Sequence, residues 1–210
     1  MKIKTMILSS VIALGVFACN NSTKKETDSG NEIASNEEEA KATSYALDTT
    51  SLVAWKGSMI GVYAHEGTLA VSGSITVKGG SVTGGSFTVD MASMVTTDDD
   101  ALYEMAPREK LIGHLQSDDF FGSATFPTAE FRVTSAEGNT LTGDLTIKGV
   151  TIEESVTDVV LTEGNGSVTA TGKLIFDRQK YGIAYENTMN DMVISDDIEL
   201  TISISGRKSK

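Results

Sequence analysis

The stretch Leu111–Phe131, which reads LIGHLQSDDFFGSATFPTAEF, decides the fold because it joins an expected helix to an expected β-strand. Helical spacing places Leu111, His114 and Leu115 on one face of its first part. Pro107 precedes them and suits the first turn of a helix, where its missing N–H would have had no partner. Four of the seven phenylalanines of the chain lie in this stretch: Phe120, Phe121, Phe126 and Phe131. One segment therefore predicts a helical lid together with an aromatic wall.

Alternation of apolar and polar residues predicts strands on both sides of that stretch. Residues 126–133 alternate and carry Pro127 near their start, the position in a strand that tolerates proline best. The same period of two recurs over residues 68–77, 87–91, 141–147, 168–177 and 198–205. Such strands bury one face and expose the other, as in antiparallel sheets. Because only residues 98–115 resemble a helix, the sequence predicts an all-β sandwich or barrel.

Glycines within the expected strands favour the barrel. Gly67, Gly73 and Gly143 lie inside or beside alternating segments, where glycine normally weakens a sheet but permits a bend at a barrel corner. A closed barrel of about eight strands can hold one small ligand in its interior. A barrel or sandwich filled by its own side chains fits the same pattern, so the alternation leaves the state of the interior open.

The first 18 residues are expected to be a lipoprotein signal peptide. Lys2 and Lys4 supply its positive start, and the apolar run over residues 6–17 is shorter than the roughly 20 residues that span a bilayer. Residues 16–19, VFAC, are similar to a bacterial lipobox, in which the cysteine is acylated and becomes the new N-terminus. An ordinary secretory signal followed by an incidental cysteine is the alternative.

Cys19 is the only cysteine, so the sequence excludes an internal disulfide. Residues 19–43 are expected to be the acylated cysteine and a disordered polar tether, because Ile33 is the one large apolar residue between Cys19 and the end of this segment. The folded domain is expected over residues 44–210. Acyl chains on Cys19 would hold that domain at a membrane. We therefore expect a lipid-anchored protein of the bacterial cell envelope, at the outer membrane or its periplasmic face.

Composition and charge exclude one class of partner. Hydrophobic residues make up 40% and charged residues 22% of the chain, which is the balance of a globular domain. The formal net charge is −12, so the chain would be repelled by a phosphate backbone. We therefore expect no nucleic-acid partner. A homodimer is left open, because oligomeric state cannot be inferred from the sequence.

The sequence offers little catalytic chemistry. His65 and His114 are far apart, and neither has metal-ligand spacing to a second histidine or a cysteine. Gly-x-Ser-x-Gly and Walker motifs are both missing from the sequence. Asp98–Asp100 could bind calcium or favour a helix N-terminus. Arg178 could pair with Asp177 or another carboxylate, or orient a ligand head group. We therefore expect no catalytic residue, no cofactor and no metal.

Several motifs together resemble the YceI-like family. They are residues 45–51 (YALDTTS), 65–75 (HEGTLAVSGSI), 110–121 (KLIGHLQSDDFF), 126–131 (FPTAEF), 141–151 (LTGDLTIKGVT) and 177–183 (DRQKYGI). This resemblance implies an extended, lipocalin-like antiparallel barrel of eight strands with a short helical lid, closed around a long apolar tunnel that binds polyisoprenoids or other long-chain amphiphiles. Thr50 departs from the pattern, since many relatives carry histidine before the serine.

The resemblance and the alternation together predict residues of the tunnel wall and the lid. The candidate lipid-binding residues are Phe87, Met91, Leu111, Leu115, Phe120, Phe126, Phe131, Phe176 and Tyr181. The predicted function is an envelope lipoprotein that stores or transports a polyisoprenoid, an isoprenoid quinone or a fatty-acid derivative. Two alternatives remain: an enzyme that acts on such a lipid through His65 or His114, and a structural or stress-protective envelope protein with a filled barrel.

Overall fold

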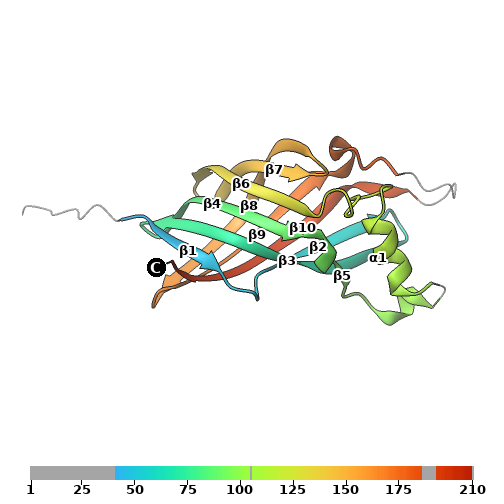
Figure 1. Cartoon of the computed structure of the whole chain (residues 1–210), viewed down its shortest axis with the longest axis horizontal. Coiled ribbons are helices and arrows are strands. Elements are labelled where there is room, and N and C mark those ends of the chain that lie inside the picture. The colour runs from blue at the N-terminus through green and yellow to red at the C-terminus, as the bar shows by residue number, and fades with distance from the viewer. Residues whose placement is uncertain (1–40, 105, 186–192, 210) are drawn as a thin grey trace, which may run out of the picture. The chain divides into compact units, whose positions relative to one another are not determined.

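The computed structural model describes residues 41–104, 106–185 and 193–209. The predicted signal peptide, Cys19 and the tether through residue 40 lie outside these ranges. Within them, no helix is long and apolar enough to span a bilayer. The described chain consists mainly of β-strands (Figure 1). The strands are β1 Thr43–Leu47, β2 Leu52–Met59, β3 Tyr63–Lys78, β4 Ser81–Asp90, β5 Val95–Thr96, β6 Thr128–Glu137, β7 Thr140–Ile147, β8 Val150–Gly164, β9 Ser167–Asp177 and β10 Ile194–Lys208.

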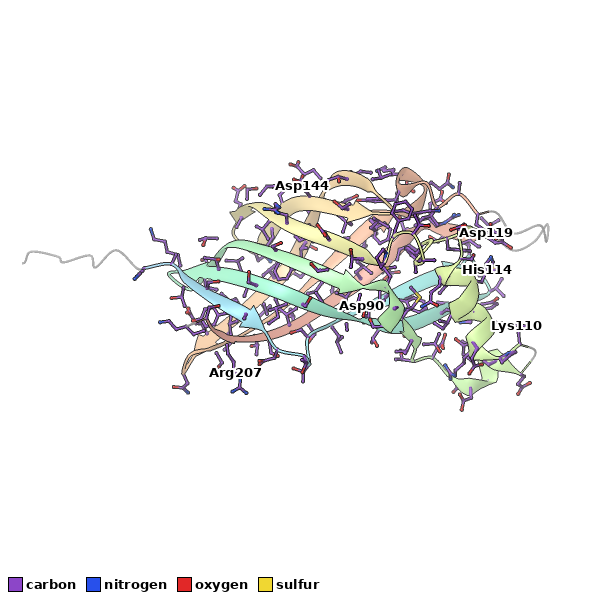
Figure 2. All side chains as sticks on the ribbon, viewed as in Figure 1. Asp90, Lys110, His114, Asp119, Asp144 and Arg207 are labelled. Atoms are coloured by element: carbon purple, nitrogen blue, oxygen red, sulfur yellow. The ribbon has the colours of Figure 1, made fainter. Side chains whose placement is uncertain are left out.

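Eight of these strands close an antiparallel barrel. Their order around the wall is β2, β3, β4, β6, β7, β8, β9 and β10, and the pairing of β10 with β2 closes the circle. β5 pairs with β3 and lies outside this cycle. The structure thus confirms the predicted all-β barrel with eight strands. Charged side chains such as Asp144 and Arg207 lie on the outside of the barrel (Figure 2).

Sharp turns connect several neighbouring strands. Three of these hairpins turn through two residues that both have positive φ, as a type I′ turn requires. The residues are Gly79 and Gly80, Lys148 and Gly149, and Asn165 and Gly166. Such turns match the twist of the flanking strands, so they favour the tight antiparallel pairing of β3 with β4, β7 with β8 and β8 with β9.

β1 and β2 together fill one position of the wall, between β10 and β3. Both strands pair with β10, and both pair with β3. Ser51 lies at the break between them, where its buried Oγ donates to Ser205 O at 2.9 Å and accepts from Ser205 N at 3.1 Å. A side chain thus satisfies backbone groups that an unbroken strand would have paired. Thr50 is exposed and pairs its hydroxyl with that of Ser205 at 3.0 Å.

The helical region is shorter and more broken than the sequence predicted. Its parts are the 3-10 helices η1 Met91–Ser93 and η2 Asp100–Tyr103 and the α-helix α1 Arg108–Gln116, and a third 3-10 helix, η3 Arg178–Tyr181, follows β9. Pro107 is extended, with ψ of 153°, and disfavours a helical conformation in the residue before it. One continuous helix from residue 98 to residue 115 therefore cannot form. Figure 1 shows α1 beside the end of the barrel where β2 ends and β3 begins.

Candidate functional site

The barrel encloses an apolar cavity of about 380 Å³. Inward side chains of all eight barrel strands line it, together with residues of α1, η1 and η3 and of the segments next to these helices. Most of these side chains are aliphatic or aromatic, as alternation predicted for the dry face of each strand. The interior is hollow, which contradicts the filled barrel that the sequence had left as an alternative.

A second hollow, of about 470 Å³, lies beside the β3–β4 and β6–β7 turns. It shares Val82, Leu141 and Val159 with the lining of the main cavity. α1 and the β2–β3 turn are at the opposite end of β3. The residues of β3 that line the main cavity run from Tyr63 to Ile75, so the main cavity follows the long direction of the strands.

Most of the predicted wall and lid residues line the cavity. These are Phe87, Met91, Leu111, Leu115, Phe120, Phe131 and Phe176. Phe126 and Tyr181 are not among the lining residues. The ring of Phe126 packs over Gly149 at the β7–β8 turn. Tyr181 is 1% exposed, but its hydroxyl donates to Glu154 Oε1 at 3.2 Å, and its ring contacts Phe176 edge-on at 5.4 Å.

The helix α1 covers the cavity with the face that the sequence predicted. Leu111, His114 and Leu115 all line the cavity. The His114 ring meets Phe120 and Tyr185 edge-on, at centroid distances of 4.9 Å and 4.7 Å. These contacts hold the C-terminal half of α1 against the barrel by ring packing.

His65, on β3, lines the same cavity and is held by a buried carboxylate. Its Nδ1 lies 2.7 Å from Asp98 Oδ2, and only 6% of the Asp98 side chain is exposed. Tyr103 donates its hydroxyl to Asp98 Oδ1 at 2.7 Å, and Arg108 Nη1 donates to the same oxygen at 3.1 Å. The backbone N–H of Glu66 donates to Oδ2 at 3.2 Å. Asp98 thus joins β3, η2 and α1.

The surroundings of Asp98 keep it ionised. Burial raises the pKa of its carboxyl, but hydrogen bonds from Tyr103, His65 and the Glu66 N–H outweigh that effect, so the pKa lies below its ordinary value. Burial, followed by the hydrogen bond to Asp98, raises the pKa of Tyr103. An ionised carboxylate only accepts hydrogen bonds, so Nδ1 of His65 carries a hydrogen. In the neutral ring, Nε2 is then a hydrogen-bond acceptor.

Trp55, on β2, lines the cavity and was not singled out by the sequence analysis. Trp55 is 8% exposed, and its Nε1–H has no hydrogen-bond partner among the described residues. The sequence does contain a pattern that indicates an inward-facing Trp55, because Val53 and Trp55 alternate with polar or small neighbours. The indole nitrogen is covered by its neighbours, and the adjacent edge of the ring packs over Gly67, so Trp55 meets the cavity through carbon atoms.

Arg178 is a structural residue. It is 3% exposed, and its guanidinium donates to the carbonyl oxygens of Ser195, Ile183 and Tyr185 at 3.0, 2.6 and 3.1 Å. Its carboxylate partner is Asp196, at 3.1 Å. Asp177, the neighbour proposed from the sequence, instead caps η3 through the N–H of Gln179.

The three residues of the acidic run Asp98–Asp100 have three different roles. Asp98 binds His65, Asp99 caps η2 through the N–H of Ala101, and Asp100 pairs with Arg108 at 2.5 Å. Only Asp99 therefore has the capping role that was predicted for the run. In the part of the chain that the structure describes, no group of acidic residues, histidines and cysteines is placed to hold a metal ion.

Comparisons with known proteins agree with this geometry. The sequence profile of the YceI-like domain matches residues 45–206. Among curated relatives, the UPF0312 protein SAB2563 of Staphylococcus aureus strain bovine RF122 is 38% identical over 88 residues, which is 36% of this chain and 48% of the relative. The UPF0312 protein SA2479 of Staphylococcus aureus strain N315 matches with the same identity and coverage. The chain thus spans about half the length of the curated relatives it matches.

Solved structures share the fold at low sequence identity. BcnA of Burkholderia cenocepacia is 21% identical with a TM-score of 0.59, and the match covers 76% of this chain and 98% of that one. A polyisoprenoid binding domain from Saccharophagus degradans, implicated in plant cell wall breakdown, is 15% identical with a TM-score of 0.54, over 80% of this chain and 99% of that one. A YCEI protein of Campylobacter jejuni is 21% identical with a TM-score of 0.51, over 73% and 84% of the two chains.

Proposed function

This chain belongs to the YceI-like family, and on that premise we propose that its barrel binds a long-chain amphiphile for storage or transport. The classes of guest that fit are polyisoprenoids, isoprenoid quinones and fatty-acid derivatives. A structural neighbour bears the name of a polyisoprenoid binding domain, which supports this choice by analogy of fold.

The observation that carries the proposal is the apolar cavity of about 380 Å³. A hydrocarbon chain gains about 0.8 kcal/mol for each methylene group that leaves water, so a long chain gains enough to offset the cost of ordering it. The aliphatic and aromatic lining supplies contact with hydrocarbon on every side. A chain-shaped apolar guest therefore suits this interior better than a compact polar one.

Extraction of the purified protein tests this proposal. The protein is made in a bacterial host, washed without detergent, extracted with organic solvent and examined by mass spectrometry. We expect a long-chain lipid in near-stoichiometric amount in the extract. An extract without such a lipid, together with failure of the protein to bind added long-chain alcohols, acids or hydrocarbons, would contradict the proposal.

We also propose that Cys19 is acylated and anchors the barrel at the cell envelope. Support comes from the apolar run that ends immediately before Cys19. Growth with a radiolabelled fatty acid should label the wild-type protein and not Cys19→Ser, and fractionation should place the wild type with membranes. Labelling that persists in Cys19→Ser would contradict the anchor.

An enzyme that acts on the same lipid is a second candidate, because His65 and Asp98 form a hydrogen-bonded pair of 2.7 Å at the cavity wall. Such a pair can act as a general base. Prolonged incubation with the extracted lipid, with Asp98→Asn as the control, distinguishes the two functions by mass spectrometry. Recovery of unchanged lipid supports binding, whereas a product that forms with the wild type and not with the variant supports the enzyme.

A further inference from the structure

The turn between β2 and β3 exposes large apolar side chains. Ile60 and Val62 flank Gly61 at its tip and are 59% and 52% exposed. The β3–β4, β6–β7, β7–β8 and β8–β9 turns instead consist of glycine and polar residues: 79–80 (GG), 138–139 (GN), 148–149 (KG) and 165–166 (NG). A tight turn needs a residue with positive φ, which Gly61 supplies at 75°. The geometry of the turn therefore does not explain why Ile60 and Val62 are aliphatic.

A third exposed aliphatic residue lies beside this turn. Val193 directly precedes β10 and is 61% exposed, and its carbonyl oxygen accepts from the Ile60 N–H at 2.8 Å. We call Ile60, Val62 and Val193 the apolar rim. Residues 57–64 (GSMIGVYA) contain no charged residue, in a chain of which 22% is charged. Exposed apolar side chains that gather at one place mark a surface that contacts another apolar phase.

The apolar rim continues into the lining of the cavity. Each of its residues is next in sequence to a lining residue, and these neighbours are Met59, Tyr63 and Ile194. Tyr63 is also 37% exposed. The rim lies at the end of the barrel beside α1, where β2 ends and β3 begins (Figure 1). An amphiphile that enters at this end would therefore stay in contact with apolar side chains from the surface to the interior.

The size of the apolar rim fits a bilayer better than a second protein. A stable protein–protein interface takes about 20–30 residues from each side. A few aliphatic side chains suffice for shallow insertion into a bilayer, because the strength of such binding follows the apolar area that is buried. Tyr63 suits the same boundary, since a tyrosine has an apolar body and a polar tip. A bilayer is also where a long-chain amphiphile resides, because water excludes its hydrocarbon.

The charges beside the apolar rim favour a bilayer without net charge. The His65 ring contacts the rings of Tyr63 and Tyr103, at centroid distances of 5.1 Å and 5.5 Å, so η2 lies next to this end of β3. Residues 98–108 contain four carboxylates and one cation, Arg108. Negative charge at this distance repels anionic head groups. Binding of the rim to a bilayer would therefore depend on apolar contact and not on attraction between charges.

We propose that the apolar rim docks the barrel on a bilayer of zwitterionic or uncharged lipid, and that the guest passes between bilayer and cavity at this end. This inference rests on the proposed function, because it assumes that the cavity holds a long-chain amphiphile. It adds the surface from which the guest is taken and the side chains that contact that surface.

A fluorescent label shows which surface enters the bilayer. Because Cys19 is the only cysteine, the full chain with Cys19→Ser accepts one label at a new cysteine and carries no acylated residue at position 19. Val62→Cys is labelled with a nitrobenzoxadiazole dye, and Ser81→Cys, exposed at the opposite end of β3, is the control. With phosphatidylcholine vesicles, we expect doxyl-labelled lipid to quench the dye at position 62 at least threefold and the dye at position 81 by less than a tenth. Added phosphatidylglycerol should not strengthen the quenching.

Transfer of a guest tests what the docking does. Donor vesicles contain cis-parinaric acid and a quenching lipid that carries nitrobenzoxadiazole, so fluorescence rises when the guest moves to the protein. In the Cys19→Ser chain, we expect a transfer rate that rises with protein concentration, as transfer on contact requires. Ile60→Ser with Val62→Ser should slow transfer at least fivefold. Ile175→Ser with Val160→Ser, two equally exposed aliphatic residues on β9 and β8, should stay within twofold.

The affinity for a dispersed guest is the control for folding and for the cavity. Displacement of the uncharged dye N-phenyl-1-naphthylamine by phytane measures it. Both double variants should bind phytane within twofold of the parent chain, because none of the four substituted residues lines the cavity.

The outcomes separate this inference from the function beneath it. Equal quenching at positions 62 and 81, or equal transfer rates in the two double variants, would overturn the inference and leave the binding function standing. A blue shift at position 62 that grows with protein concentration without vesicles would show that a second copy covers the rim, and would also overturn it. If neither phytane nor cis-parinaric acid binds, the binding function fails, whereas the labels still decide whether the rim enters a bilayer.

Discussion

Gly67 is a residue at which one added carbon atom would disturb the barrel wall. A Cβ there would meet the carbonyl oxygen of Val95 and lie 2.5 Å from Cζ2 of Trp55. Both neighbours are fixed, since Val95 contributes backbone and Trp55 is buried in the wall. Glycine at this position therefore allows β5 and the indole ring to approach β3 closely.

The first prediction is that Gly67→Ala destabilises the protein by about 2 kcal/mol, because the added methyl group overpacks a filled site. Urea unfolding measures the change. The matched control is Gly57→Ala on the neighbouring strand, where a Cβ would meet only Ile198 Cδ1 at 3.7 Å. That control should stay within about 0.5 kcal/mol of the wild type. Equal stability of the two variants would contradict the close packing at Gly67.

The second prediction concerns Asp98 and pH. Its pKa is lower in the folded protein than the ordinary value, so its contribution to stability is present above that value and is lost as the pH falls through the folded pKa. Asp98→Asn should lower the free energy of unfolding by about 2 kcal/mol at neutral pH, because charged hydrogen bonds are lost. The difference should shrink below about pH 4.

Urea unfolding at neutral and acidic pH measures that difference. The control is Asp99→Asn, since asparagine also caps helices and Asp99 is exposed. We expect the control to change stability by less than about 0.5 kcal/mol at either pH. A difference between Asp98→Asn and the wild type that is the same at both pH values would show that the carboxylate charge is not what stabilises the cluster.

At the scale of elements, α1 depends on the barrel for its position. It has nine residues, fewer than an isolated helix needs in water, and none of them is fully buried. Its end is held by Gln116, whose side-chain amide donates to Met91 O at 3.3 Å. The residues of α1 that face the cavity are Leu111, His114 and Leu115, whereas Lys110 is exposed (Figure 2). α1 is therefore a short cover whose apolar face lines the cavity.

The third prediction is that Leu115→Ala weakens binding of phytane about tenfold, because a lost leucine contact costs on the order of 1.5 kcal/mol. Dye displacement measures this affinity. Lys110→Ala, on the exposed face of the same helix, should bind phytane like the wild type. If the two variants bound phytane equally well, α1 would not contact the guest.

At the scale of the whole molecule, we expect the length of the cavity to limit the length of the guest proposed for it. Ala170 lies on β9 opposite Ile204 of β10, whereas Phe176 lies opposite Ile198, nearer the end that α1 covers. Ala170 lines the cavity and is small. A larger side chain at Ala170 would fill the part of the cavity that is far from α1. The end of the cavity that α1 covers would be unchanged.

The fourth prediction is that Ala170→Phe weakens binding of geranylgeraniol at least tenfold and leaves binding of the shorter geraniol within twofold. Dye displacement with both alcohols measures the ratio. Thr169→Phe is the control, because Thr169 is exposed on the same strand. A uniform loss of both affinities in Ala170→Phe would show that guests do not lie along the barrel.

The sequence by itself determined six of the eight barrel strands and the cavity-facing side of α1. Each follows from local chemistry: a period of two marks the apolar face of a strand, and spacings of three and four define one face of a helix. Pro107 also interrupts the expected helix through a local effect, although the sequence analysis treated it only as a helix start.

Only the tertiary structure decided that the barrel is closed and hollow, and that Trp55, His65 and Asp98 lie together. β2 and β10 pair although they are far apart in the chain, and Asp98 meets His65 across 33 positions. The alternation of residues shows which side of each strand is apolar. It does not show which strands pair with each other, or how much space is left between side chains that face each other. Those properties depend on contacts between distant residues, which exist only once the chain has folded.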